Sequence, residues 1–203
     1  MPLITEQEML AKRGQRFLRW TQNILLMAGV LALCYVALTL LYAKLYQNAA
    51  NHSLDQQIQA EEQQPASPSM PPMKEGDLLG KIEIPRLGLS VAVLQGTSYK
   101  TLLLGVGHIK GTAYPGESGN VGMAGHRDTY FRALKDIRMG DEIQIQTATG
   151  LSRYEVDWVK IVAPTENKLL APSAESALTL VTCYPFYYIG AAPKRYVVHA
   201  RRQ

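Results

Sequence analysis

Hydrophobic residues follow two different patterns along the chain. Between residues 20 and 43 there is no charged side chain, and the core of this run reads ILLMAGVLALCYVALTLLYA. Twenty helical residues span about 30 Å, which is the thickness of the hydrocarbon core of a membrane. Trp20 and Tyr42 lie near its ends, where aromatic rings prefer the membrane interface. The run therefore predicts a transmembrane helix, which we place at residues 20–46.

The residues around this run indicate its orientation. Four basic side chains come just before it: Lys12, Arg13, Arg16 and Arg19. Basic flanks stay in the cytoplasm, so we expect the N-terminus inside and the rest of the chain outside. The alternative is a cleaved signal peptide, but its apolar region is shorter and ends in a small-x-small site, which residues 48–50 match poorly. An uncleaved signal anchor is therefore favoured.

A polar segment follows the apolar run. Residues 47–76 are rich in Gln, Ala, Ser and Pro and contain few large apolar side chains. Such a segment buries too little surface to offset the entropy lost on ordering, so we expect a flexible stalk whose first half can extend the membrane helix. The expected organisation is a cytoplasmic N-terminus (1–19), a signal anchor (20–46), a stalk (47–76) and an outer domain (77–203).

The outer domain consists of short, β-branched segments separated by Gly and Pro. Polar and apolar residues alternate in several of them, as Ile143 and Ile145 do with Gln144 and Gln146. A period of two is typical of strands with one buried face. We expect strands at 80–85, 89–94, 120–126, 142–148, 152–164, 178–183 and 194–200. Many short strands with turn signals between them favour a barrel or a sandwich.

One segment has a helical pattern instead. Asp128 is a suitable N-cap for residues 129–137, in which Phe131, Leu134 and Ile137 form an apolar stripe at i, i+3 and i+6. The outer domain is therefore predicted to be mostly β, with one or two short helices.

Composition and charge exclude several classes of function. The formal net charge is only +4, and Lys and Arg are scattered without a basic stripe, so we expect no nucleic-acid partner. No His or Cys pair has the spacing of metal ligands, so we expect no metal site. Gly105-Val106-Gly107 lacks the rest of a dinucleotide fingerprint, and the chain has no Walker-type loop, so we expect no cofactor.

The chain has two cysteines, and they lie in different regions. Cys34 falls in the apolar run and Cys183 in the outer domain, so they cannot form a disulfide within one chain. Disulfides are favoured outside the cytoplasm, so an unpaired Cys183 indicates either intermolecular pairing or a working thiol. The structural alternative is a small buried hydrophobic residue, which free Cys often is.

A nucleophilic thiol needs a base and a group that stabilises negative charge. His108 and His126 both follow glycines, and His126 ends a predicted strand, where side chains emerge at the rim of a sheet. If the last two predicted strands pair as a hairpin, Arg195 faces Cys183 across the mouth of their connecting loop. Its guanidinium is then able to donate to an oxyanion. An ordinary hydrogen-bonded His and an ordinary edge-strand Arg are the alternatives at these positions.

The residues around Cys183 resemble the sortase family of transpeptidases. Thr-Leu-Val-Thr-Cys at 179–183 matches the family's Thr-Leu-x-Thr-Cys signature, with a His ending an earlier strand and Arg195 opening a later one. Three segments are most similar to class D sortases: GHIKGTAYPGESGNVGMAGHRDTYFRAL (107–134), RMGDEI (138–143) and TCYPFYYIGAAPKRYVV (182–198). The resemblance covers residues 78–202.

The resemblance implies a fold and a set of catalytic residues. The fold is an eight-stranded sortase-type β-barrel with short helices, preceded by the transmembrane helix. Cys183 is then the nucleophile, His126 the general acid and base, and Arg195 the residue that positions substrate and stabilises the oxyanion. Further candidates for oxyanion or substrate contacts are Thr182, Thr179 and Tyr184.

The implied reaction takes place at the cell envelope. A sortase cleaves a C-terminal sorting signal of Leu-Pro-x-Thr-Gly or Leu-Pro-x-Thr-Ala type in a secreted protein and transfers the acyl group to an amine of a peptidoglycan precursor or a pilin. A single-pass protein of the cell membrane, with a cytoplasmic N-terminus and an extracytoplasmic catalytic domain, fits that family. Two other hypotheses account for the unpaired thiol: a different cysteine enzyme that acts on peptidoglycan, and a non-catalytic anchored adaptor.

Overall fold

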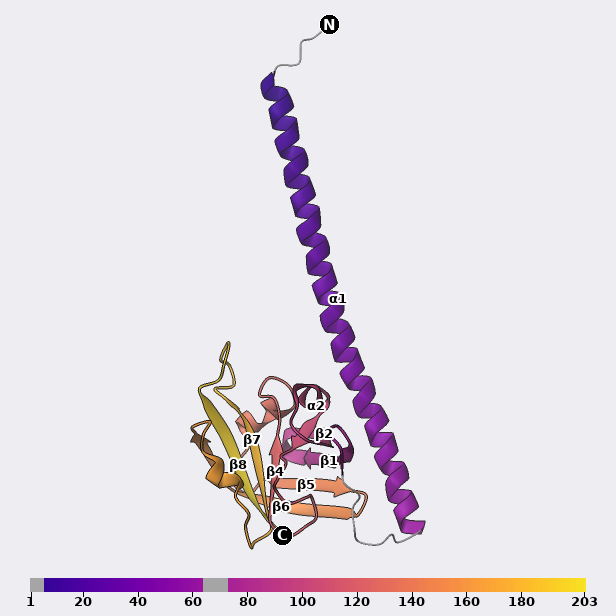
Figure 1. Ribbon diagram of the computed structural model, residues 1–203, viewed down its shortest axis with the longest axis vertical. Coiled ribbons are helices and arrows are strands. Elements are labelled where there is room, and N and C mark those ends of the chain that lie inside the picture. The colour runs from indigo at the N-terminus through magenta and orange to yellow at the C-terminus, as the bar shows by residue number, and fades with distance from the viewer. Residues whose placement is uncertain (1–5, 64–72) are drawn as a thin grey trace. The chain divides into compact units, whose positions relative to one another are not determined.

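The computed structural model describes residues 6–63 and 73–203 of the chain (Figure 1). By its internal contacts the chain divides into two units, Met1–Lys44 and Leu45–Gln203. The first unit is helical where it is described. The second contains the last turns of the same helix and all of the strands.

The long helix α1 comprises Glu6–Gln63. Its stretch Arg19–Ala50 contains an 18-residue window with a mean hydropathy of 2.6 and is long and apolar enough to cross a membrane. The predicted anchor at 20–46 lies within this stretch. The helix continues into the segment predicted as a stalk, and residues 64–72 of that segment lie outside the described residues. The boundaries of anchor and stalk therefore stay predictions.

Eight strands form a closed barrel in the order β1-β2-β3-β4-β7-β8-β6-β5 (Figure 1). The strands are β1 (Leu78–Ile84), β2 (Leu89–Gln95), β3 (Val106–His108), β4 (Asn120–Ala124), β5 (Glu142–Thr147), β6 (Gly150–Val162), β7 (Ala177–Tyr184) and β8 (Lys194–Arg202). The short helices are α2 (Tyr99–Leu104) and the 3-10 helices η1 (Pro85–Leu87), η2 (Tyr130–Asp136) and η3 (Asn167–Leu170). The expected eight-stranded barrel is confirmed, and seven strands lie within two residues of their predicted ends.

Strand β3 is the one that hydrophobic alternation misses, because three residues are too few to show a period. Val106 pairs in parallel with Val93 of β2, and Gly107 pairs with Ala124 of β4. A Cβ atom on Gly107 would lie 2.2 Å from the backbone oxygen of Gly96. The glycine therefore permits the chain to pass close to its neighbour, which is a common reason for glycine inside a sheet.

The predicted helix at 129–137 forms, but as the 3-10 helix η2 and not as an α-helix. Its N-cap is Thr129 rather than Asp128, and no side chain caps it. Phe131, Leu134 and Ile137 are all buried. Their spacing of three matches the three residues per turn of a 3-10 helix, so the tighter helix keeps all three on one line toward the core.

The period of two sorts the residues of β7 between the barrel interior and its outer face. Leu178, Leu180 and Thr182 are at most 2% exposed, whereas Val181 and Cys183 are partly exposed. Thr179 has the parity of the outer face but is fully buried, with its hydroxyl beside the carbonyl of Leu169 in η3. Burying a leucine side chain stabilises a fold by about 1.5–3 kcal/mol, so a one-residue slip of this strand would be costly. The packing of the core thus fixes the thiol on the outer face.

Candidate active site

The thiol and the guanidinium are brought together by the β7–β8 hairpin. Cys183 pairs directly with Arg195 in this antiparallel ladder, which confirms the hairpin pairing inferred from the sequence. Residues directly opposite in such a ladder have Cα atoms about 4.5–5.5 Å apart and side chains on the same face. The two groups therefore emerge together on the outer face of the barrel.

His126 reaches the same end of the barrel from the other side of β7. Strands β4 and β7 pair in parallel, with Ala124 opposite Val181, and the N–H of Gly125 donates to the carbonyl of Val181 at 3.2 Å. His126 and Cys183 each lie two residues beyond that pair. They therefore stand at the same ends of neighbouring strands, which are about 4.8 Å apart in a sheet.

The three side chains at this end of the barrel differ in their hydrogen bonding. Cys183 is a free thiol of intermediate exposure. Among the described residues, the Nε2 atom of His126 is buried and has no hydrogen-bond partner. Nη1 of Arg195 donates to the carbonyls of Ala192 at 3.3 Å and Lys194 at 3.1 Å, which holds the guanidinium beside the loop.

Helix α2 borders the histidine. The ring of Tyr99 lies edge-on to the imidazole of His126, with 6.1 Å between ring centroids. The start of α2 is held by the Glu75 carboxylate, which accepts hydrogen bonds from the N–H of Ser98 at 3.0 Å and the hydroxyl of Thr101 at 2.9 Å. Lys110, paired with Glu75 at 2.9 Å, does most to lower the pKa of that carboxyl to about 2.

Two of the sequence-predicted contact residues have their hydroxyls inside the fold. Thr179 is fully buried and donates to Asn120 Oδ1 at 2.8 Å. Thr182 is 2% exposed and donates to the carbonyl of Gly125 at 2.7 Å. The hydroxyl of Thr182 thereby ties β7 to the residue before His126. Both hydroxyls are engaged in the packing of β4 against β7.

Tyr184, the third predicted contact, lies next to the thiol at the end of β7. Its half-buried ring contacts two aromatic neighbours: Phe186 edge-on at 6.0 Å and Tyr196 in a stacked arrangement at 6.1 Å between centroids. This aromatic cluster packs against the core. Since successive side chains of a strand point to opposite faces, the ring of Tyr184 lies on the face of β7 opposite the thiol of Cys183.

His108, the other histidine weighed from the sequence, has a structural environment. It is 1% exposed, and its Nδ1 and Nε2 atoms lie 2.8 Å from Gln95 Oε1 and 2.9 Å from the carbonyl of Ala113. Its ring stacks on Tyr114 at 4.8 Å between centroids. Burial lowers the pKa of His108, since desolvation disfavours the imidazolium.

Arg127 is the neighbour of the site that sequence reasoning missed. It directly follows His126, and its guanidinium donates to the carbonyls of Pro185, Tyr188 and Gly190. The sequence indicates a role for Arg127 only through its position next to the candidate catalytic histidine. Its partners are backbone carbonyls, which have no side-chain signature.

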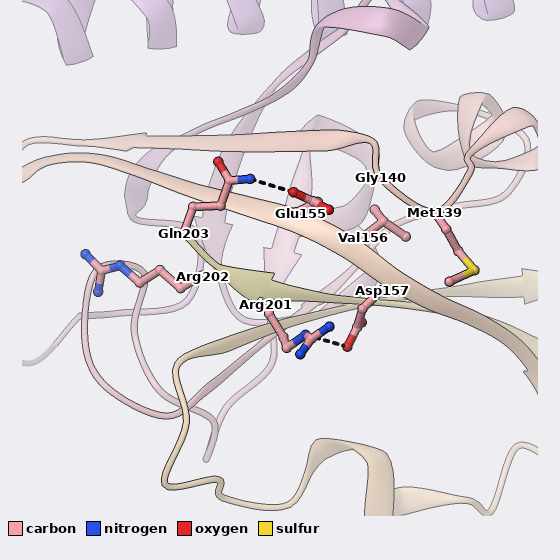
Figure 2. A pocket seen from close by; sticks show the side chains of 8 residues that line it. All are labelled: Met139, Gly140, Glu155, Val156, Asp157, Arg201, Arg202 and Gln203. Carbon is pink, nitrogen blue, oxygen red and sulfur yellow. Dashed lines mark hydrogen bonds and ion pairs between the residues drawn. The ribbon is translucent and has the colours of Figure 1, made fainter.

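Figure 2 shows a hollow whose lining includes side chains of β6 and of the C-terminal end of β8. It has a volume of about 600 Å³ and is lined by residues that include Met139, Asp157 and Arg201. Arg201 pairs with Ala177, six positions before Cys183 on β7. At about 3.4 Å per residue, six residues of strand separate the hollow from the thiol by about 20 Å. The hollow is therefore too far from Cys183 to be part of the candidate active site. Within the described residues, no group of three or more His, Cys, Asp or Glu side chains is arranged to hold a metal ion.

Comparison with known proteins identifies the fold. The sortase domain model matches residues 82–203. Sortase D of Bacillus subtilis (strain 168) is 38% identical over 128 residues, which is 63% of this chain and 65% of that protein. Sortase A of Bacillus anthracis is 29% identical over 125 residues, 60% of this chain and 58% of that protein. The chain thus spans less than two thirds of the length of these curated relatives.

Solved structures agree with this assignment. A Clostridium perfringens sortase D5 transpeptidase superposes with a TM-score of 0.66 at 26% identity, over 78% of this chain and 98% of that chain. Sortase C1 from Streptococcus suis superposes with a TM-score of 0.59 at 29% identity, over 63% and 74% of the two chains. Since the domain model also covers more than half of the chain, from the second half of β1 to the C-terminal residue, this protein belongs to the sortase family.

Proposed function

We propose that this sortase is a membrane-anchored cysteine transpeptidase, with Cys183 as nucleophile, His126 as general acid and base, and Arg195 as oxyanion donor. The observation that carries the proposal is the register of three neighbouring strands, in which β4 and β8 bring His126 and Arg195 to either side of the thiol on β7. A thiol, a nitrogen that exchanges a proton and a permanent cation are the groups that acyl transfer through a thioester requires.

The first half of the proposed reaction breaks a peptide bond. The Cys183 thiolate attacks the carbonyl carbon, and Arg195 donates to the oxygen that becomes negative. The C–N bond then breaks, and the leaving amine takes a proton from His126. The products are an acyl-thioester on Cys183 and a neutral His126.

The second half forms the new amide. An acceptor amine gives a proton to His126 and attacks the thioester carbonyl, which passes through a second oxyanion beside Arg195. The C–S bond breaks, and the thiolate is restored. Water competes with the amine for the same thioester, so binding of the acceptor decides between transfer and hydrolysis.

The proposed donor is a secreted protein with a C-terminal sorting signal of Leu-Pro-x-Thr-Gly or Leu-Pro-x-Thr-Ala type, and the proposed acceptor is an amine of a peptidoglycan precursor or a pilin. Sortase membership supports this class of reaction. The apolar stretch Arg19–Ala50 supports a membrane anchor. The basic residues before it support a single pass with a cytoplasmic N-terminus and an extracytoplasmic catalytic domain.

The test uses the full-length chain in detergent micelles, with peptides of both sorting-signal types as donors and hydroxylamine as a simple amine. We expect cleavage and transfer by the wild type and by the Cys34→Ala variant, and none by Cys183→Ala. Removing a single oxyanion donor costs about 10²–10³ in kcat, so we expect a loss of this size for Arg195→Gln. Mass spectrometry should find the donor fragment attached to Cys183.

Equal activity of wild type and Cys183→Ala, or no activity of either across the peptide panel, would contradict the proposal for these substrates. An acyl group on Cys183 that derives from peptidoglycan would favour a different cysteine enzyme of the envelope. Slow alkylation of Cys183 that is insensitive to substitution of His126 and Arg195 would favour a non-catalytic adaptor.

A further inference from the structure

Two kinds of contact hold the loop between β7 and β8, residues 185–193. Phe186 at its start is buried in the core, and arginine side chains bind the rest of the loop. Among the described residues, none of the backbone–backbone hydrogen bonds outside helices and strands involves this loop. Its carbonyls are instead bound by guanidinium groups: Pro185, Tyr188 and Gly190 by Arg127, and Ala192 by Arg195. A loop without backbone hydrogen bonds of its own depends on such side chains for a defined conformation.

Arg127 makes the larger part of this network. Nη1 donates to the carbonyl of Pro185 at 3.1 Å, and Nη2 donates to the carbonyls of Tyr188 at 2.8 Å and Gly190 at 2.9 Å. The guanidinium carbon also lies 5.9 Å from the centre of the Tyr188 ring, within the range of a cation–π contact. One side chain thus connects three points spread over the loop.

The chemistry of the contact calls for an arginine. A guanidinium is planar and has donors on separate nitrogens, so it is able to bind carbonyls that point at it from different directions. A lysine ammonium is a compact point charge on a flexible stem. Lys at position 127 would keep the charge but not the fork that reaches Pro185 and Gly190 together.

The position of Arg127 in the chain connects this loop to the proposed active site. Arg127 directly follows His126, and the loop that it holds starts after the strand of Cys183 and ends at the strand of Arg195. The apolar tip of the loop is strongly exposed: Tyr187 by 73%, Tyr188 by 47% and Ile189 by 99%. An exposed apolar tip does not pack on the core, so its position depends on the arginines that contact it. Besides Arg127 these include Arg132, whose guanidinium carbon lies 5.2 Å from the centre of the Tyr187 ring.

We propose that Arg127 is a positioning residue that fixes the β7–β8 loop as one wall of the substrate groove beside Cys183. The role of the loop as a wall rests on the transpeptidase function proposed above. Arg127 acts through the loop backbone and not on the reacting atoms. Its loss therefore weakens productive binding of a peptide more than it changes the reactivity of the thiol.

The test compares Arg127→Lys and Arg127→Ala with the wild type, in the full-length chain in detergent micelles. Arg153→Ala is the matched control, because Arg153 is a surface arginine on β6 whose side chain is 56% exposed and pairs with Glu142. Three quantities are measured: the rate of chymotryptic cleavage after Tyr187 or Tyr188, kcat and KM for a peptide of the more active sorting-signal type, and the alkylation rate of Cys183 by iodoacetamide.

Both Arg127 variants are expected to be cleaved in the loop about tenfold faster or more, because the loop opens more often. We expect KM to rise about threefold or more with a smaller change in kcat, and alkylation of Cys183 to stay within about twofold of the wild type. Arg153→Ala should match the wild type in all three. Arg127→Lys keeps the positive charge. If its cleavage rate and KM rise like those of Arg127→Ala, the shape of the guanidinium and not its charge holds the loop.

The proposal is overturned if loop cleavage or KM of Arg127→Lys stays within about twofold of the wild type, because the three-carbonyl fork would then be dispensable. If Arg127→Ala does not fold, as judged by circular dichroism, the lysine variant decides. If Cys183→Ala retains transfer activity, the proposed function fails, while the cleavage rates still report whether Arg127 holds the loop.

Discussion

Gly125 is the position at which the fold constrains the proposed histidine most directly. It lies between strand β4 and His126, and a Cβ atom there would lie 2.7 Å from Cδ2 and 2.8 Å from Cγ of Phe131. Phe131 is fully buried, and its N–H donates to the carbonyl of His126 at 3.1 Å. In Gly125→Ala the ring cannot move into solvent, so ring and backbone must shift together.

The expected cost follows from two opposing effects. Overpacking a filled core costs about 1–3 kcal/mol. Gly125 has no positive φ, so alanine is compatible with its backbone and regains about 0.4–1 kcal/mol by restricting the unfolded chain. We expect Gly125→Ala to lower the free energy of unfolding by about 1–2 kcal/mol. A displacement of His126 by about 1 Å would lower kcat/KM by about 10²-fold.

The assays are urea unfolding followed by near-ultraviolet circular dichroism, and kcat/KM for the sorting-signal peptide, both on the full-length chain. Phe131→Leu removes Cε2, which would lie 3.1 Å from the new methyl group. It also replaces the rigid ring by a smaller side chain whose Cδ atoms are able to rotate away from that methyl group. The double variant Gly125→Ala/Phe131→Leu should therefore be more stable than the sum of its parts, by about 1 kcal/mol. Gly29→Ala, whose methyl group meets no atom within 4 Å, is the control for adding a methyl group without a clash.

The steric reasoning is refuted if Gly125→Ala unfolds within about 0.5 kcal/mol of the wild type and its effect adds to that of Phe131→Leu without coupling. A stable Gly125→Ala variant with normal kcat/KM would also show that the position of His126 does not depend on this contact.

Three further predictions concern groups around the site. Thr179→Val leaves the buried carbonyl oxygen of the Asn120 side chain without its 2.8 Å donor and should cost about 1–3 kcal/mol in urea unfolding, whereas Thr179→Ser should retain most of the stability. Lys110 and the other donors lower the pKa of Glu75 to about 2. The contribution of the Glu75 carboxylate to stability is therefore fully present above pH 4.5 and is lost as the pH falls toward 2. Glu75→Gln should flatten the acid side of a plot of thermal midpoint against pH. Burial lowers the pKa of His108, so below pH 6.5 the unfolded chain binds a proton that the folded chain does not. Stability therefore falls with decreasing pH, by at most about 1.4 kcal/mol per pH unit. If the slope of stability against pH is the same in His108→Gln as in the wild type, this assignment is wrong.

Much of the fold could be predicted because its signals are local. The uncharged run from residue 20 to residue 43 has the length of a membrane helix whatever surrounds it. Alternation along 142–148 and 152–164 located strands β5 and β6 within two residues. A short or shared local signal decides less. Strand β3 was missed because it has only three residues, and the stripe at 129–137 predicted a helix without deciding between an α-helix and a 3-10 helix.

Some residues of the candidate site could likewise be predicted from local sequence, and others could not. The unpaired thiol, and Arg195 opposite it, follow from the order of residues along one hairpin, and a hairpin is a local structure. His126 and His108 both follow glycines and look alike in the sequence. Only the tertiary structure separates them, because β3 carries His108 into the interior and the parallel pairing of β4 with β7 carries His126 to the rim beside Cys183.

The sequence by itself determined the candidate anchor, the mostly-β outer domain and the identity of the thiol and its guanidinium partner, because periodicity, run length and hairpin pairing act between near neighbours. Tertiary structure alone decided that the hydroxyl of Thr182 is buried against Gly125 and that Arg127 holds the β7–β8 loop. Those contacts join residues about sixty positions apart, such as Thr182 with Gly125 and Arg127 with Gly190. Their acceptors are backbone carbonyls, which every residue has, so no pattern of side chains announces them.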